Sequence, residues 1–235
     1  MQTHCLINLY NDYSTLPMAI HSIKDVVDNI IVADGAYQKY YDTYKQSVAD
    51  AQPWSTDGSF EILDALRIHC PPIKVIMCPD GRPWINQCVK RTALLDAVPE
   101  GDWFIVLDAD EMLFGDAAYG LNQIQVSGCL AGSMPIYNPG LDVSAMVPVW
   151  HPRVFLKING MHYARKHWLL QDEHHRLIET QYPVKWTDEM VLCHLKVFRG
   201  KGRLLPHMGY MHMMSLDGWM EPDVRKAPQQ FNLPG

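Results

Sequence analysis

The sequence predicts an α/β fold with a mostly parallel β-sheet flanked by helices. Short apolar and β-branched runs alternate with amphipathic helical patterns through the first half of the chain, as expected for parallel strands joined by crossover helices. Of the 235 residues, 48% are hydrophobic and 20% are charged, which is ordinary globular usage. This length can bury one sizeable core. We therefore expect a single domain over residues 1–235, with halves at 1–115 and 116–235, the second contributing a mixed subregion.

Strands and helices are expected to alternate along the first half. The first two strands are expected at residues 4–10 and 29–33, and the helix between them begins near Ser14 with Pro17 in its first turn. The next helix is expected at residues 59–66, capped by Ser59. A strand, a helix and a fourth strand follow at residues 73–78, 84–97 and 103–107. Ligands of such sheets bind beyond the carboxyl ends of the strands, so functional residues are expected there.

Residues 36–54 interrupt this alternation and carry four tyrosines. The segment is either a lid or acceptor-binding loop, or a surface helix that packs its tyrosines. After Phe114 the pattern weakens, and strands are expected at residues 132–137, 147–157 and 191–198. The final residues, 221–235, are rich in proline and glutamine and are expected to be extended or loosely docked.

Several classes of protein are disfavoured by composition. The longest apolar runs have about five residues, whereas a membrane span needs roughly 20. Lysine and arginine are absent from the first 23 residues and no long apolar block follows Met1, so we expect no secretory leader and a cytoplasmic location. The six cysteines contain no Cys-x-x-Cys pair and are expected to be reduced, with a disulfide frame or zinc site as the alternative.

Charge is unevenly distributed along the chain. Residues 1–120 contain 17 acidic and 8 basic side chains, and residues 121–235 contain 9 acidic and 12 basic ones. Seven of the eleven histidines lie between His151 and Tyr210. This asymmetry suggests a cation site in the first half and an anion site in the second, although it is also compatible with a surface charge that has no function.

An acidic cluster ends the fourth expected strand, in the segment GDWFIVLDADEML (101–113). Asp108, Asp110 and Glu111 would repel one another unless a divalent cation or strong hydrogen-bond donors neutralised them. Carboxylates together with diphosphate oxygens are ligands suited to Mg²⁺ or Mn²⁺. The alternative is a turn in which the aspartates cap the following segment.

Four separated segments match one protein family in order: LYNDYSTLPMAIHSI (9–23), NIIVADG (29–35), STDGSFEIL (55–63) and VKRTALLDAVPEGDWFIVLDADEML (89–113). Over residues 1–115 the chain resembles the family 2 type glycosyltransferases of the GT-A fold, a Rossmann-related fold. Two features depart from the family pattern. Thr92 stands where asparagine is frequent, and the 36–54 insertion separates segments that are usually adjacent.

The resemblance implies a nucleotide-sugar site, with a UDP-sugar as the expected donor. The positions implied for the nucleoside end are Tyr10, Asn11, Asp34 and Asp57. Arg91 would hold Asp57 or the phosphate region, while Asp108 and Asp110 would bind ribose and a Mn²⁺ or Mg²⁺ ion that stabilises the departing diphosphate. The alternatives are a turn at Asp34 and a charge on a helix surface at Arg91.

The segment VLCHLKVFRGKGR (191–203) resembles a late region of many GT-A enzymes. The resemblance implies that His194 is a third metal ligand and that Lys196 and Arg199 contact the diphosphate. A structural role for His194 is the alternative.

Transfer with inversion, which the family implies, needs a general base. The nearest candidates are Asp172 and Glu173, followed by Asp188 and Glu189. His167 and Trp168 resemble an acceptor-side element, although this histidine-rich span could also be a solvated surface. The acceptor is either a saccharide or a hydroxylated base in DNA, because basic and aromatic residues are frequent there. A noncatalytic sugar-nucleotide or carbohydrate-binding module is the alternative function.

Overall fold

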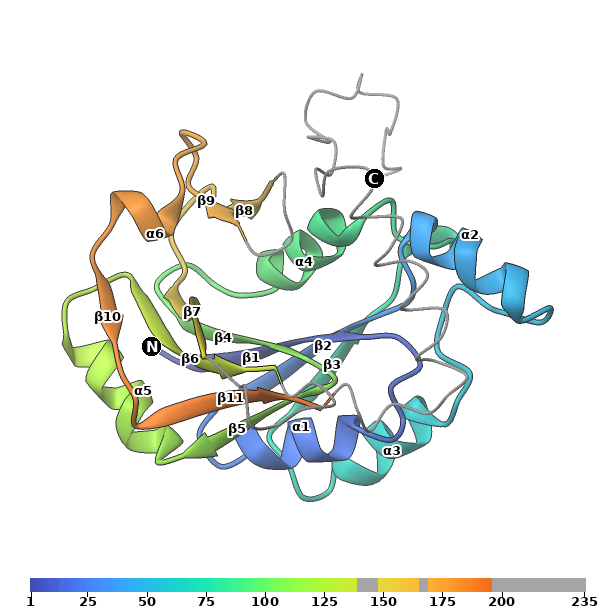
Figure 1. Cartoon of the computed structure of the whole chain (residues 1–235), viewed down its shortest axis with the longest axis horizontal. Coiled ribbons are helices and arrows are strands. Elements are labelled where there is room, and N and C mark those ends of the chain that lie inside the picture. The colour runs from blue at the N-terminus through green and yellow to red at the C-terminus, as the bar shows by residue number, and fades with distance from the viewer. Residues whose placement is uncertain (139–147, 165–168, 196–235) are drawn as a thin grey trace.

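A computed structural model describes residues 1–138, 148–164 and 169–195. Nine strands form one sheet in the order β3-β2-β1-β4-β7-β6-β11-β5, and β10 also pairs with β6. Figure 1 shows α1 and α3 on one side of this sheet and α4 on the other. The predicted α/β architecture, a mostly parallel sheet flanked by helices, is confirmed.

The first four strands are parallel to one another: β1 (Thr3–Leu9), β2 (Asn29–Asp34), β3 (Ile73–Ile76) and β4 (Trp103–Asp108). The helices of this half are α1 (Leu16–Ile23), α2 (Gln38–Ser47), α3 (Ser59–Leu66) and α4 (Gln87–Asp96), with a short 3₁₀ turn at Pro79–Gly81. The predicted strands and helices are therefore present, with ends that shift by a few residues.

The helix predicted at residues 84–97 begins later than expected, at Gln87. The backbone N–H of Trp84 donates to Ala36 O at 2.8 Å and its carbonyl accepts from Gln38 N at 2.6 Å, which keeps this residue out of the helix. The side chain of Asn86 then accepts from Val89 N at 2.9 Å and caps the helix.

The second half adds antiparallel pairing. Its strands are β5 (Glu111–Gly115), β6 (Ala131–Tyr137), β7 (Val149–Leu156), β10 (Val184–Trp186) and β11 (Met190–His194), and a separate hairpin is formed by β8 (His162–Tyr163) and β9 (Leu170–Gln171). The helices are α5 (Ala117–Val126) and α6 (Ile178–Gln181). The strands predicted at 132–137, 147–157 and 191–198 correspond to β6, β7 and β11, whereas the other elements were not predicted. The elements that were not predicted are short or have a weak hydrophobic periodicity, so the sequence pattern did not indicate them. Residues 221–235 lie outside the described residues.

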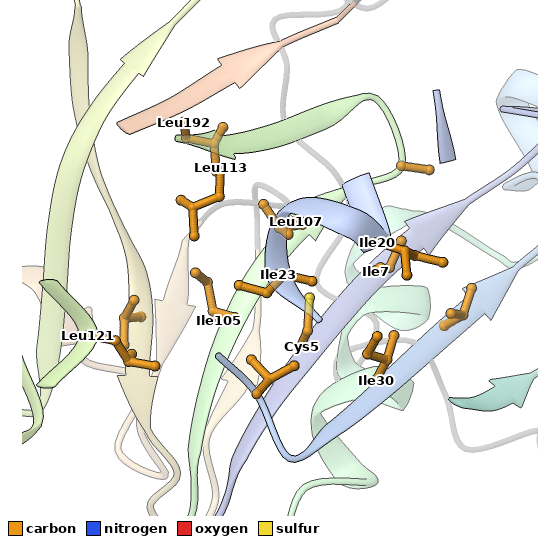
Figure 2. Packing of buried hydrophobic residues seen from close by; sticks show 14 of the residues in the cluster. Cys5, Ile7, Ile20, Ile23, Ile30, Ile105, Leu107, Leu113, Leu121 and Leu192 are labelled. Atoms are coloured by element: carbon orange, nitrogen blue, oxygen red, sulfur yellow. The ribbon is translucent and has the colours of Figure 1, made fainter. Parts of the chain in front are cut away.

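Strand alternation divides the apolar side chains between two cores. The first core lies on the α1 face of the sheet; Figure 2 shows Cys5 and Ile7 of β1 and Ile105 and Leu107 of β4 packing there with Ile20 of α1. The second core lies on the α4 face. It contains Leu6 of β1, Leu94 of α4 and Phe104 of β4, whose ring stacks on Phe155 of β7 at 5.4 Å.

The 36–54 insertion forms α2. Of the two expectations for this segment, the structure matches the surface helix that packs its tyrosines. Tyr40 is buried and stacks on Tyr44, and both rings meet the edge or face of Tyr10 with centroids 5.8 Å apart. The helix therefore covers the residue that follows β1.

All six cysteines are free thiols, as expected. Among the described residues, every helix is too short or too polar to cross a membrane.

Candidate active site

The topology gathers the predicted functional segments at one edge of the sheet. Strands β1, β2 and β4 are parallel, so their carboxyl ends meet there. Strand β6 runs in the same direction as β4 because both are antiparallel to β7, and β11 is parallel to β6. His194 at the end of β11 therefore reaches the same edge as Asp108 and Asp110 after β4.

Cationic side chains contact the acidic cluster at this edge. Asp108 accepts from the Arg91 guanidinium at 2.5 Å. Glu111 is fully buried and accepts from Arg153 at 2.7 Å and from Asp108 N at 2.7 Å. The repulsion expected among the carboxylates is thus relieved in part by strong donors. Sequence reasoning assigned no role to Arg153, which lies 42 residues from Glu111 in the chain.

His194 lies between two of these carboxylates. Its Nε2 is 2.9 Å from Glu111 Oε1, and its Nδ1 is 3.8 Å from Asp110 Oδ2, longer than a hydrogen bond. Burial acts to lower the pKa of His194, but the charges of Glu111 and Asp110 outweigh it and raise the pKa to about 9. Two predicted metal ligands, Asp110 and His194, are therefore neighbours.

The side-chain atoms at this edge are of the types that bind a hard divalent cation. Mg²⁺ commonly binds one or two carboxylates together with substrate phosphates and waters, and imidazole is an accepted ligand of several metals. Asp108 and Asp110 supply carboxylates, and His194 Nδ1, a buried atom with no hydrogen bond to any described residue, faces Asp110. Among residues 1–138, 148–164 and 169–195, no group of three His, Cys, Asp or Glu side chains is arranged to hold a metal ion. A cation at this edge would therefore need oxygen atoms of a substrate to complete its shell.

Asp34 lies beneath the surface at the end of β2. Its carboxylate is fully buried and accepts from Ser55 N at 2.9 Å and from Ser55 Oγ at 2.5 Å. Burial raises the pKa of Asp34, while Lys90 and the hydrogen bonds from Ser55 act against this rise. In this arrangement the carboxylate connects β2 to the returning end of the insertion, and its contact with a nucleoside stays a prediction.

The loop after β1 is hydrogen-bonded to residues 55–57. Asn11 adopts φ 50° and its side-chain oxygen accepts from Thr56 N at 2.9 Å. Asp57 accepts from Tyr13 N at 2.8 Å and from Ser59 N at 3.1 Å, at the start of α3. Asn11 and Asp57 thus lie in one connected loop pair, although the predicted Arg91–Asp57 contact is not the one formed, since Arg91 donates to Asp108.

Tyr10 is less accessible than expected for a residue lining a base pocket. Its side chain is 4% exposed, its hydroxyl donates to Gln52 O at 2.7 Å, and the rings of Tyr40 and Tyr44 pack against it. The α2 insertion therefore determines how much of Tyr10 a ligand could reach.

Lys90 is a buried cation that sequence reasoning missed. It is 2% exposed, and its Nζ donates to Leu9 O at 2.6 Å and to Gly35 O at 2.5 Å, bridging the ends of β1 and β2. A signal was available, because Lys90 lies four residues before Leu94 and therefore on the same, sheet-facing side of α4.

The predicted bases differ in their surroundings. Asp172 is buried and accepts from His174 N, Arg176 N and the Arg176 side chain, and from Tyr182 Oη at 3.0 Å. Burial acts to raise the pKa of Asp172, but these hydrogen bonds outweigh it and hold the pKa well below its usual range. Asp172 is therefore a poor general base, since an effective base has a pKa near the working pH. Its contacts instead fix the turn after β9.

Asp188 lies away from the acidic cluster, and its role as a general base stays a prediction. It precedes β11 (Met190–His194), whereas His194 ends that strand, so the two residues lie toward opposite ends of β11. Glu173 is exposed, with its carboxylate 3.6 Å from His174 Nε2.

Four predicted site residues lie outside the described residues: His167, Trp168, Lys196 and Arg199.

Comparisons with known proteins give weak similarities. The sequence matches no family model and no curated protein. The 1-349 form of S. aureus TarS matches with 15% identity and a TM-score of 0.41, over 60% of this chain and 37% of that chain. The same form in complex with UDP gives 14% identity and a TM-score of 0.42, again over 60% and 37%. The chain thus spans little more than a third of that form of TarS.

The second kind of structural neighbour is the 2-C-methyl-D-erythritol 4-phosphate cytidylyltransferase (IspD) of Francisella tularensis. It matches with 12% identity and a TM-score of 0.34, over 96% of this chain and 84% of that chain. Likeness at this level assigns no activity to the chain.

Proposed function

We propose that this protein is a glycosyltransferase that moves a sugar from a UDP-sugar to a hydroxyl acceptor with the help of Mn²⁺ or Mg²⁺. The observation that carries the proposal is the meeting of Asp108, Asp110 and His194 at the sheet edge where the loops after β1 and β2 also end. The order of sequence segments that resembles the GT-A family supports it independently.

Together with oxygen atoms of the substrate, Asp108, Asp110 and His194 would hold the cation, which when bound would stabilise negative charge on the departing diphosphate. The surrounding residues orient these ligands. Glu111 accepts from His194 Nε2 and so turns Nδ1 toward Asp110, while Arg91 fixes one oxygen of Asp108. Such outer contacts preorganise a site before substrate arrives.

The nucleoside end of the donor is proposed to bind over the connected loops at Asn11 and Asp57, with Asp34 and Tyr10 beneath them. Lys196 and Arg199 keep their proposed diphosphate role, and His167 and Trp168 their acceptor role. Of the predicted bases, Glu173 is the candidate we favour, because Asp172 is saturated by donors and Asp188 lies toward the opposite end of β11 from His194.

A thermal-shift experiment with UDP and Mn²⁺ tests the nucleotide and metal parts together. A ligand at one hundred times its Kd stabilises a protein by about 2.7 kcal/mol, which corresponds to a rise in Tm of roughly 5–11 °C for a chain of this size. We expect this rise only when both are present, and its loss in Asp110→Asn and His194→Ala. Asp64→Asn, on the exposed surface of α3, is the matched control.

A radiolabelled UDP-sugar assay tests the reaction. Release of UDP with transfer of the sugar, or hydrolysis without acceptor, is the expected result. Release of pyrophosphate from a nucleoside triphosphate would indicate nucleotidyl transfer instead. A wild-type protein that binds UDP-sugars but turns none over would support the noncatalytic alternative.

A further inference from the structure

Two tryptophans form an exposed aromatic pair in the second half of the chain. Trp150 of β7 is 38% exposed and Trp186 of β10 is 56% exposed, and their ring centroids are 5.5 Å apart with planes inclined at 56°. Neither ring belongs to the two cores. Large apolar side chains that gather on a surface commonly mark a binding site.

Strand β6 shows which face of the sheet this pair occupies. Its residues Met134 and Ile136 belong to the first core, so Ser133 and Pro135 point to the opposite, α4 face. Residues directly across a strand pair share a face, and Pro135 pairs with Trp150 whereas Ser133 pairs with Trp186. Both tryptophans therefore lie on the α4 face.

Asp108 lies on the same face. On β4, Ile105 and Leu107 belong to the first core, so Asp108 points to the other side, where it meets Arg91 of α4. The aromatic pair and the acidic cluster thus open toward the same side of the sheet.

The pair is also close to the cluster across the sheet. Strands β4, β7 and β6 are consecutive, and β7 is antiparallel to β4, so the first residues of β7 lie toward the carboxyl end of β4. Trp150 on β7 is one strand spacing from β4, and Trp186 on β10 is three spacings away, which is roughly 5 Å and 14 Å across the sheet. A substrate of a few linked rings could therefore reach from the indoles to Asp108.

We infer that Trp150 and Trp186 form an acceptor subsite that binds a saccharide, with a sugar ring stacked on indole. This inference rests on the proposed function and names the acceptor class for it. The axial C–H groups of a pyranose make one of its faces apolar and slightly positive, which suits the negative face of an aromatic ring. The hydroxyl groups at the edge of the sugar remain hydrated or find polar partners.

The residues between the indoles favour a neutral ligand. Ser133 and Pro135 carry no charge, whereas a nucleic acid bound by stacking also needs lysine or arginine along its phosphates. Ser133 Oγ is buried and makes no hydrogen bond to any described residue, so a hydroxyl group that entered between the rings would find a partner there.

Saturation-transfer NMR on the full chain tests the subsite, with neutral tetrasaccharides of glucose, galactose and N-acetylglucosamine as probes. We expect saturation on the ring C–H protons of at least one tetrasaccharide. Its affinity should fall about tenfold or more in Trp150→Ala and Trp186→Ala, as for aromatic residues at the centre of an interface. Trp186→Phe, which keeps an aromatic face, should recover most of the affinity.

Tyr119→Ala is the control, since this exposed aromatic residue lies on α5. The proposal is overturned if no tetrasaccharide binds to the wild type, or if both tryptophan variants bind the tetrasaccharide as tightly as the wild type does. It is also overturned if an oligonucleotide with 5-hydroxymethylcytosine binds and loses affinity in the variants while the saccharides do not. The Mn²⁺-dependent rise in Tm caused by UDP should be unchanged in the Trp150, Trp186 and Tyr119 variants. Its absence from the wild type would contradict the proposed function and not the subsite, which the NMR experiment measures without donor.

Discussion

Replacement of Lys90 by methionine is the most direct test of how the site edge is held together. The change keeps the length of the side chain and removes its ammonium group. Leu9 O and Gly35 O would lose their donor, and the buried carboxylate of Asp34 would lose a neighbouring positive charge. All three groups lie where β1 and β2 end, so the substitution should destabilise the protein at this end of the sheet.

The size of the effect follows from the burial of Lys90, which is 2% exposed. Leaving a buried acceptor without its donor costs about 1–3 kcal/mol, and because two carbonyls lose their donor and Asp34 loses a nearby positive charge, we expect a loss of about 3–5 kcal/mol. For a chain of this size each kcal/mol corresponds to roughly 2–4 °C. We therefore expect Lys90→Met to lower Tm by roughly 6–20 °C.

Thermal unfolding followed by circular dichroism measures this change. Lys74→Met, the same substitution at an exposed position on β3, is the matched control and should shift Tm little. The double variant Lys90→Met with Asp34→Asn should recover part of the loss, since the buried negative charge is then absent. Equal Tm values for the Lys90 and Lys74 variants would refute the reasoning, and so would a double variant with strictly additive losses.

Three further changes test other contacts. Asp172→Asn should destabilise the protein at pH 7. Because the folded-state pKa of Asp172 is lowered, its contribution is present above the unfolded value and lost as pH falls below about 4, so the Tm difference from wild type should be smaller at pH 3 than at pH 7. In urea unfolding, Gly35→Ala should lower the free energy of unfolding by about 1–3 kcal/mol more than Gly101→Ala. Both glycines have positive φ, but only at Gly35 would an added Cβ lie 3.0 Å from Pro53 O. Equal losses in the two variants would contradict this prediction. Glu111→Gln should lower the free energy of unfolding by about 3–5 kcal/mol, since Arg153 and His194 lose their shared carboxylate. The control is Glu61→Gln at an exposed position. Equal losses of unfolding free energy in the two variants would contradict the prediction and would mean that water compensates Arg153 and His194.

The parallel half of the fold was predictable because its strands are buried on both faces. Such strands are continuous apolar runs, as at residues 103–107, and the helices between them carry a clear apolar side. The second half was less predictable. Strands β8 and β9 have two residues each and α6 has four, too few for a periodic pattern to show.

Part of the candidate site was also visible in the sequence. Asp108 and Asp110 end an apolar strand, and His194 ends another, so their common edge followed once the strand directions were known. The residues that balance their charge were not visible. Arg153 approaches Glu111 from β7, and its position depends on an antiparallel pairing that no local pattern encodes.

The order of chain segments thus determined which residues end each parallel strand, because burial on both faces leaves its mark in the composition of a strand. Only the tertiary structure decided the partners of those residues. It brought Arg91 to Asp108 and Lys90 to the ends of β1 and β2, and it set Trp150 beside Trp186 on the face of the sheet that Asp108 shares. The physical reason is that a side-chain contact between distant segments depends on register and crossover direction, which are properties of the whole sheet.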